Sequence, residues 1–124
     1  MKSPDSLSQV AEFHYTFHHP VLKKPEIPSK NRCDLRVELI SEELQELKEA
    51  IENNDLVEVA DALCDIQYVL SGAILEFGMG DKFKALFDEV QRSNMSKACN
   101  NEDEALLTVE HYKSKGIESY YKKD

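Results

Sequence analysis

The stretch from Ser41 to Asp65 contains nine acidic residues and one basic residue, Lys48. Downstream, Lys and Arg are absent from Glu49 through Asp81. Yet the remaining residues of this stretch are mostly apolar and recur at the spacing of a helix face that packs in a core. A fold containing this stretch must therefore place carboxylates beside buried apolar surface, where each is paired, protonated or bound to a metal.

The composition favours helices. Glu, Leu, Ala and Lys dominate the 124 residues, which include only four Gly and four Pro. No alternation of apolar and polar residues lasts long enough to indicate a sheet, apart from the last few residues. A chain of this length is enough for one continuous core, so we expect a single all-α domain over residues 1–124.

The positions of caps and breakers divide this domain into helices. Asp55 is a suitable N-cap after the turn residues that precede it, and the sequence Gly-Met-Gly-Asp ends the helix that follows. The short connections indicate antiparallel neighbours in a four-helix-type bundle, followed by a short C-terminal helix or tail. The helices are expected at about Asp5–His18, Asn31–Asn53, Asp55–Phe77, Asp81–Lys97 and Glu104–Lys113.

Charge and cysteine content limit the partners. The net charge of −9 disfavours nucleic acid and anionic lipid as general partners. Three cysteines are an odd number without metal-ligand spacing, which indicates a reducing cytosol rather than a disulfide framework. The chain has no apolar run of the length of a signal peptide or membrane span. We therefore expect a cytoplasmic protein that does not bind membranes.

The third expected helix is apolar nearly all round, which predicts a buried central helix. A narrow strip in its first half carries Glu58, Asp61 and Asp65. On the second helix, Glu43 and Glu46 lie beside the apolar stripe. Antiparallel packing of the two helices turns the pair on the second helix toward Glu58 and Asp61. Such an oxygen-rich cage suits Mg²⁺ or Mn²⁺ better than zinc or copper.

These motifs resemble a known family. The segments EELQE (Glu42–Glu46) and EVAD (Glu58–Asp61) are similar to the EExxE…ExxD motif of the all-α nucleoside triphosphate pyrophosphohydrolases. That superfamily includes MazG-like proteins, dimeric dUTPases and phosphoribosyl-ATP pyrophosphohydrolases. The segments VAEFHYTFHHPV and FDEVQRSNMSK look like its phosphoribosyl-ATP pyrophosphohydrolase-like, MazG-type branch. Two departures are a short gap between the acidic pairs and Gln91, where near relatives often have His.

The resemblance implies a function and a set of ligands. It implies an oligomeric helical bundle that hydrolyses a nucleoside triphosphate, or a related compound, to the monophosphate and pyrophosphate, a reaction suited to nucleotide-pool house-cleaning. Mg²⁺ would be held by Glu43, Glu46, Glu58 and Asp61, with Asp65 as an additional ligand or a group just behind the ligands. A carboxylate left free by incomplete coordination, Glu43 or Glu46, would serve as the general base.

Positive side chains are expected to bind the remaining phosphates. The resemblance favours Asn94 and Lys97, with Arg92 beside them, although these residues could also only cap a helix. Lys30, Arg32 and Arg36 are weaker candidates. His14 and Tyr68 are expected to pack in the core, and Cys64 to be a small buried group.

Alternative functions differ in what they require. Phosphoribosyl-ATP is one alternative substrate. A di-iron bundle would need Glu-x-x-His pairs, which the sequence lacks. A non-catalytic acidic adapter would have exposed acids and no metal dependence.

The wide apolar arc of the third helix also indicates a homodimer or a dimer of dimers.

Overall fold

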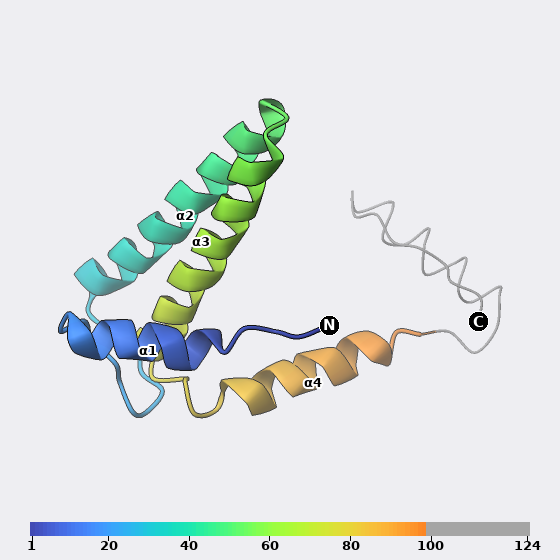
Figure 1. The fold of residues 1–124 in the computed structure, drawn as a ribbon. Helices are drawn as coiled ribbons and strands as arrows, with labels where there is room; N and C mark the ends of the chain where they lie inside the picture. The colour runs from blue at the N-terminus through green and yellow to red at the C-terminus, as the bar shows by residue number, and fades with distance from the viewer. Residues whose placement is uncertain (99–124) are drawn as a thin grey trace. The chain divides into compact units, whose positions relative to one another are not determined.

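The computed structural model describes residues 1–98, and within them it has four helices and no strand. The helices are α1 (Ser6–Thr16), α2 (Lys30–Glu52), α3 (Leu56–Glu76) and α4 (Phe83–Met95) (Figure 1). The all-α prediction is confirmed, and the expected helix Glu104–Lys113 lies outside the described residues. The chain forms two compact units, Met1–Phe83 and Lys84–Asp124, which are described separately. Each helix in residues 1–98 is too short or too polar to cross a bilayer.

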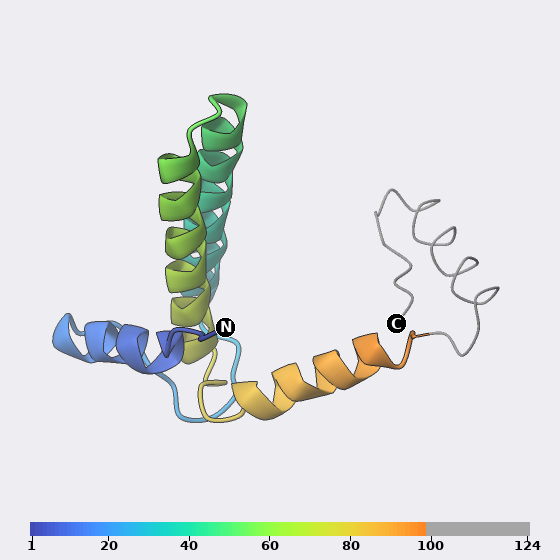
Figure 2. The same ribbon diagram turned by 45° about the vertical axis from the view of Figure 1, so that its right-hand side comes forward.

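The first unit is built on an antiparallel hairpin of α2 and α3, as predicted. The two helices lie side by side in both views (Figures 1 and 2). The turn between them is tight, because Asn54 adopts a φ of 51°, a left-handed conformation that Asn tolerates. The expected N-cap is also confirmed, since the backbone N–H of Glu58 donates to Asp55 Oδ1 at 3.1 Å.

The contact between α2 and α3 uses small side chains. Ala50 and Ala62 are buried near the turn, and Ser71 and Gly72 are buried toward the other end of α3. Within Met1–Phe83, α3 packs against α2 and α1, which cannot cover its whole circumference. Leu56, the first residue of the helix, is 80% exposed. The prediction that this helix is buried nearly all round is therefore wrong for the single chain.

Two side chains expected in the core lie at its edge instead. Cys64 is exposed. Tyr68 is 41% exposed, and its ring meets that of Phe13 on α1 edge-on, with 5.7 Å between the ring centroids. Phe13 also stacks on His19 at a centroid distance of 5.7 Å. An aromatic contact between α1 and α3 thus replaces the expected burial of Tyr68.

A buried ion network joins the end of the hairpin that lies away from the turn. Glu76, which is 1% exposed, accepts hydrogen bonds from Nε and Nη2 of Arg32 on Oε1, at 2.9 and 2.5 Å. Arg36 Nε donates to the other oxygen, Oε2, at 3.3 Å. Burial raises the pKa of the Glu76 carboxyl, but the hydrogen bonds and charges of the two arginines outweigh it and hold the pKa below its usual value. Glu76 is therefore ionised and paired.

Helix α1 is attached at the same place. His14 is 2% exposed, and its Nδ1 donates to the carbonyl of Pro20 at 3.0 Å. The expectation of a packed histidine is confirmed. Gly72 makes room for the ring, because a Cβ at this position would stand 3.1 Å from His14 Nε2 and 2.7 Å from Arg36 Nη1. Burial and the charge of Arg36 lower the pKa of His14, although its bond to Pro20 opposes them.

The connection between α1 and α2 closes the C-terminal end of α3. The N–H groups of Leu22 and Glu26 donate to the carbonyls of Leu75 and Phe77, at 3.1 and 3.0 Å. Carbonyl groups at the C-terminal end of a helix are only partly satisfied within the helix, so the connection supplies additional donors to them. Gly78 follows with a φ of 73°, and a Cβ there would stand 1.8 Å from the carbonyl oxygen of Lys24. The proline-containing connection therefore needs glycine at residue 78.

We expect the substitution Glu76→Gln to lower the free energy of unfolding by about 3 kcal/mol, because it leaves the buried Arg36 without a carboxylate. Urea denaturation followed by circular dichroism measures this loss. The matched control is Glu12→Gln, an exposed acid on α1, which should change stability by less than about 0.5 kcal/mol. Equal effects of the two substitutions would contradict the role given to the ion network.

We expect His14 to destabilise the fold at acidic pH. Since its pKa is lower in the folded chain than the usual 6.5, the unfolded chain binds a proton first as the pH falls below that value. The His14 contribution is thus complete above about pH 6.5 and is lost on acidification. The free energy of unfolding of His14→Asn, measured between pH 8 and pH 5, should fall less steeply than that of wild type. Parallel profiles would exclude His14 as the cause.

Candidate metal centre

Three carboxylates meet between α2 and α3. Glu43 and Glu46 lie one turn apart on α2, and Asp65 faces them from α3. Each of the three can place one carboxylate oxygen within 4.8 Å of the others. Because the helices are antiparallel, a step toward the N-terminus of α2 corresponds to a step toward the C-terminus of α3. Glu43 therefore lies opposite Asp65, while Glu46 lies nearer the turn.

The environment of Glu43 is unfavourable for an isolated charge. Its Oε2 is buried and accepts no hydrogen bond from the described residues. Burial raises the pKa of Glu43 to about 7, together with a hydrogen bond to Glu46 and the charges of Glu46, Asp65 and Glu42. Burial also raises the pKa of Asp65, with the charges of Asp61 and Glu46. Without a cation, this cluster is a site of repulsion and incomplete solvation.

No positive side chain among residues 1–98 pairs with these carboxylates. The ion pairs in that range join Lys30 to Asp34, Arg32 and Arg36 to Glu76, Lys84 to Asp88, and Arg92 to Glu89. Both arginines of α2 therefore pair with Glu76, at the end of the hairpin away from the turn. Three converging carboxylates, with one buried oxygen that has no partner among residues 1–98, offer the oxygen ligands that hard divalent cations prefer.

The other two predicted ligands lie next to this cluster, toward the turn. Glu58 and Asp61 are exposed and line a hollow of about 390 Å³ together with Glu46. Glu46 therefore belongs both to the cluster and to the hollow. The structure brings Asp65, which the sequence placed only in a supporting role, to Glu43 and Glu46. Asp61 and Glu58 lie four and seven residues before Asp65 on α3, toward the turn.

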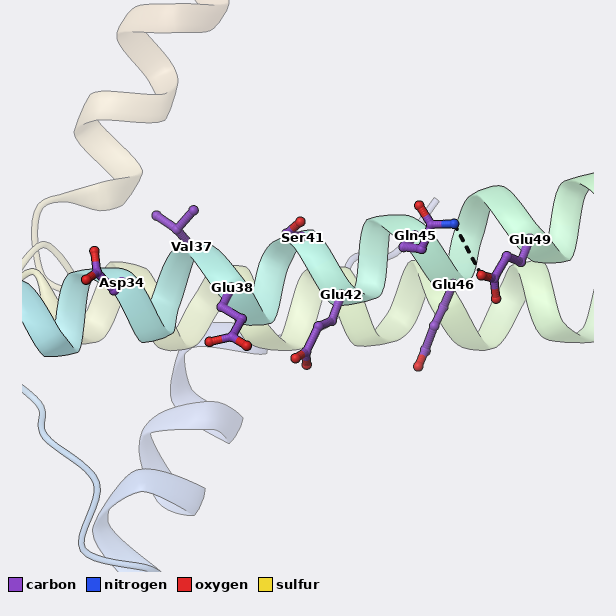
Figure 3. Close-up of a pocket in the computed structure, with 8 residues that line it drawn as sticks. All are labelled: Asp34, Val37, Glu38, Ser41, Glu42, Gln45, Glu46 and Glu49. Carbon is purple, nitrogen blue, oxygen red and sulfur yellow. Dashed lines mark hydrogen bonds between the residues drawn. The ribbon is translucent and has the colours of Figure 1, made fainter.

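The remaining acids of α2 are exposed. Asp34, Glu38, Glu42 and Glu49 line an open depression of about 710 Å³ that belongs to this one helix. Figure 3 shows Glu38, Glu42 and Glu46 projecting to the same side, and Gln45 Nε2 donating to Glu49 Oε1 at 3.2 Å. Only Glu46 of this set belongs to the carboxylate cluster. The other acids form a solvated face.

The predicted phosphate-binding residues lie in the second unit, at the end of α4. Arg92 Nη2 bonds to Glu89 Oε1 at 2.6 Å, and Lys97 Nζ donates to Asn94 Oδ1 at 3.2 Å. All of these side chains are exposed. Their role in binding phosphate stays a prediction. By contrast, the weaker candidates Arg32 and Arg36 serve the ion network.

Sequence reasoning missed Glu76. A signal for it was present, since Arg32 and Arg36 are one turn apart on α2 and Glu76 lies about as far beyond the turn as Arg32 lies before it. Residues equally distant from a tight turn meet in an antiparallel hairpin.

Comparisons with known proteins agree with these motifs. A family model described as phosphoribosyl-ATP pyrophosphohydrolase matches residues 10–94, more than half of the chain. An uncharacterized protein, L479, of Acanthamoeba polyphaga mimivirus is 34% identical over 96 residues. The match covers 74% of this chain and 38% of that relative, so the chain spans less than two fifths of the relative's length. The matched region contains all five carboxylates, Arg92 and Asn94, and ends three residues before Lys97.

We expect Mn²⁺ or Mg²⁺ to raise the unfolding temperature of the protein. A cation at one hundred times its dissociation constant stabilises the fold by about 2.7 kcal/mol.

At pH 8 the metal-free Glu43→Gln variant should melt at a higher temperature than metal-free wild type. A pKa raised from 4.5 to about 7 means that ionisation of Glu43 costs stability as the pH rises through that range. Differential scanning fluorimetry with and without metal measures both effects.

The same substitution should remove most of the stabilisation by metal. Glu52→Gln is the matched control, because Glu52 is an exposed acid at the end of α2 and should melt and respond to metal like wild type. An equal response of Glu43→Gln and wild type to metal would show that the cation binds elsewhere.

Proposed function

The chain belongs to the phosphoribosyl-ATP pyrophosphohydrolase family, and on that premise we propose that it hydrolyses a nucleoside triphosphate, or a related nucleotide, to the monophosphate and pyrophosphate. The observation that carries the proposal is the cluster of Glu43, Glu46 and Asp65 with its buried oxygen atom that has no partner. Hydrolysis of phosphoanhydride bonds is the general activity of this family. The dependence on Mg²⁺, the substrate and a role in nucleotide-pool house-cleaning are our proposals.

The donor set fits a hard cation. All the candidate donors are carboxylate oxygens, which Mg²⁺ and Mn²⁺ prefer and which zinc and copper sites rarely use alone. Glu43, Glu46 and Asp65 would hold the ion, and Glu58 and Asp61 would offer further oxygens from the adjoining hollow. When bound, a divalent cation neutralises phosphate charge and lowers the pKa of the attacking water.

The residues of the chain then have distinct tasks. A carboxylate that is not fully used in coordination, Glu43 or Glu46, accepts the proton of the attacking water. The water oxygen forms the new bond to phosphorus, and the bond from phosphorus to the bridging oxygen breaks and releases pyrophosphate. The exposed hollow beside Glu46 gives the phosphates an open approach to the site.

Substrate binding requires positive groups in addition to the carboxylates. We propose that Arg92, Asn94 and Lys97 bind the phosphates, as the resemblance to the family implies. Their polar side chains lie together over two turns at the end of α4. Guanidinium and ammonium groups bind phosphate oxygens with charge-assisted hydrogen bonds. The negative charge of the chain makes such a local group necessary.

Phosphoribosyl-ATP itself is the second candidate substrate, because the matching family is described by that activity. It carries the same kind of phosphoanhydride bond. The non-catalytic adapter is less well supported. Such a protein needs exposed acids, and Glu58 and Asp61 are exposed, but it gives no reason for the buried oxygen of Glu43 that has no hydrogen-bond partner among the described residues.

We also propose a homodimer or a dimer of dimers, assembled through the hairpin. Exposed apolar side chains recur every seven residues on both helices, the spacing at which helices pack in pairs. On α2 these are Val37, Leu44 and Ile51, and on α3 they are Leu56, Leu63 and Leu70. A second copy is a suitable occupant, since a two-fold axis would set equivalent stripes against each other.

The odd number of cysteines still favours a reducing cytosol as the compartment.

The reaction is tested by pyrophosphate release from canonical and modified nucleoside triphosphates and from phosphoribosyl-ATP, with Mg²⁺ or Mn²⁺. We expect Glu43→Gln and Glu46→Gln each to lower kcat by at least about a hundredfold. Glu58→Gln, Asp61→Asn and Asp65→Asn should raise the metal concentration required for half-maximal activity. Glu52→Gln is again the control and should retain the wild-type rate.

The results separate the alternatives. Release from phosphoribosyl-ATP alone would identify the second candidate substrate. Full activity of both Glu43→Gln and Glu46→Gln would mean that the proposed site is wrong. No release from any compound, with a folded wild-type protein, would contradict the enzymatic proposal and favour the adapter.

A further inference from the structure

We infer that the ion network of Arg32, Arg36 and Glu76 is a positioning device for the carboxylate cluster. It fixes the alignment of α2 on α3 that places Glu43 opposite Asp65, although none of its members belongs to the cluster. The inference rests on the proposed function, because it concerns the same metal centre. It gives a role to buried charges that the reaction itself does not use.

The contacts at the two places follow one alignment. Arg36 Nη1 lies 2.7 Å from the point where a Cβ of Gly72 would stand, so Arg36 crosses α3 at Gly72. Seven residues further along α2 is Glu43, and seven residues back along α3 is Asp65. Since both helices rise about 1.5 Å per residue, the Arg36–Gly72 crossing and the Glu43–Asp65 pair belong to the same antiparallel register. A slide of α2 along α3 that alters the Arg36–Gly72 crossing therefore also alters the Glu43–Asp65 pair.

The hydrogen bonds of the network oppose a shift of α2 along α3. Arg32 and Arg36 are one turn apart on α2, and each bonds to a different oxygen of one carboxylate. A slide of α2 in either direction lengthens the bond of one arginine. Buried ion pairs contribute little net stability compared with apolar packing, but they are well suited to specifying register.

The cluster needs such a support. Glu43, Glu46 and Asp65 place carboxylate oxygens within 4.8 Å of one another, and repulsion between like charges at that distance acts to separate α2 from α3 in the middle of the hairpin. The apolar packing beside them is slight, because the buried residues near the turn are the small Ala50 and Ala62. The tight turn holds the helices at one end. The ion network holds them at the other, with the cluster between.

Gly72 is part of the device. Its lack of a side chain opens the slot that Arg36 occupies, and His14 of α1 lies over the same slot. The substitution Gly72→Ala would put a methyl group 2.7 Å from Arg36 Nη1, which must then move. The absence of a side chain at Gly72 thus allows both the observed position of Arg36 and the close approach of α2 to α3.

The test measures Mn²⁺ binding by electron paramagnetic resonance, with Mn²⁺ alone as the probe. The variants are Arg32→Gln, Arg32→Lys and Gly72→Ala. Arg32 is one third exposed and its loss leaves the Arg36–Glu76 pair, so Arg32→Gln keeps a folded hairpin. The matched control is Lys30→Gln, which removes a cation from the same end of α2; among residues 1–98, Lys30 pairs with Asp34 alone, one turn along the same helix. Binding is measured at a temperature at which circular dichroism shows every variant folded.

The sign of the effect separates positioning from plain electrostatics. Removing a positive charge, by itself, should tighten the binding of a cation slightly, and Lys30→Gln measures that effect. We expect Arg32→Gln and Gly72→Ala to weaken Mn²⁺ binding about tenfold, and Arg32→Lys to recover part of the loss. Unchanged or tighter binding by folded Arg32→Gln would overturn the inference and leave the network a structural role alone.

A different result identifies failure of the premise. If wild type binds no Mn²⁺, the proposed metal centre is wrong and the positioning role is overturned with it. If wild type binds Mn²⁺ and Glu43→Gln does not, the metal centre stands, and the Arg32 variants alone decide the inference.

Discussion

The alignment of α2 against α3 is the constraint on which the rest of the first unit depends. The turn at Asn54 and the Asp55 cap fix it at one end. At the other end Glu76 joins two arginines of α2, and His14 fastens α1 over the same place. Between these ends the small side chains of Ala50 and Ala62 allow the two helices to approach closely. At that separation the carboxylates of Glu43, Glu46 and Asp65 converge.

This convergence is electrostatically costly in the chain by itself. Burial and neighbouring charges raise the pKa of Glu43 to about 7, and the positive side chains of α2 that lie in the interface are committed to Glu76. Selection for stability alone would favour a neutral pair here. The arrangement is consistent with a site that exchanges stability for the capacity to bind a divalent cation, as functional sites commonly do.

Much of this could be predicted from the sequence. The two long helices, their antiparallel pairing and the N-cap of Asp55 follow from local patterns, because a tight turn and helical periodicity act over short distances. Periodicity also separates the proposed ligands Glu43 and Glu46, which lie beside the apolar stripe of α2, from Glu42, Glu49 and Glu52. The grouping of Asp65 with Glu43 was only partly foreseen, since rotation of two helices about their axes is set by packing at their ends.

Other features could not be predicted from local pattern. Glu76 looked like an ordinary helix-end acid, yet it is buried between Arg32 and Arg36, which lie 44 and 40 residues before it in the sequence. The apolar circumference of α3 indicated burial, but the single chain leaves Leu56 and Leu63 exposed. Periodicity shows that a face is apolar and does not show whether the same chain or another copy covers it.

The most direct test of the central claim is a crystal structure of the protein with Mn²⁺, with the ion located by its anomalous scattering. The account predicts an anomalous peak between α2 and α3, with oxygens of Glu43, Glu46 and Asp65 at about 2.0–2.2 Å from the ion. Oxygens of Asp61 or Glu58 completing the coordination would agree with the hollow beside Glu46. An ion bound only to exposed acids such as Glu42 and Glu49, with no peak between the helices, would contradict it.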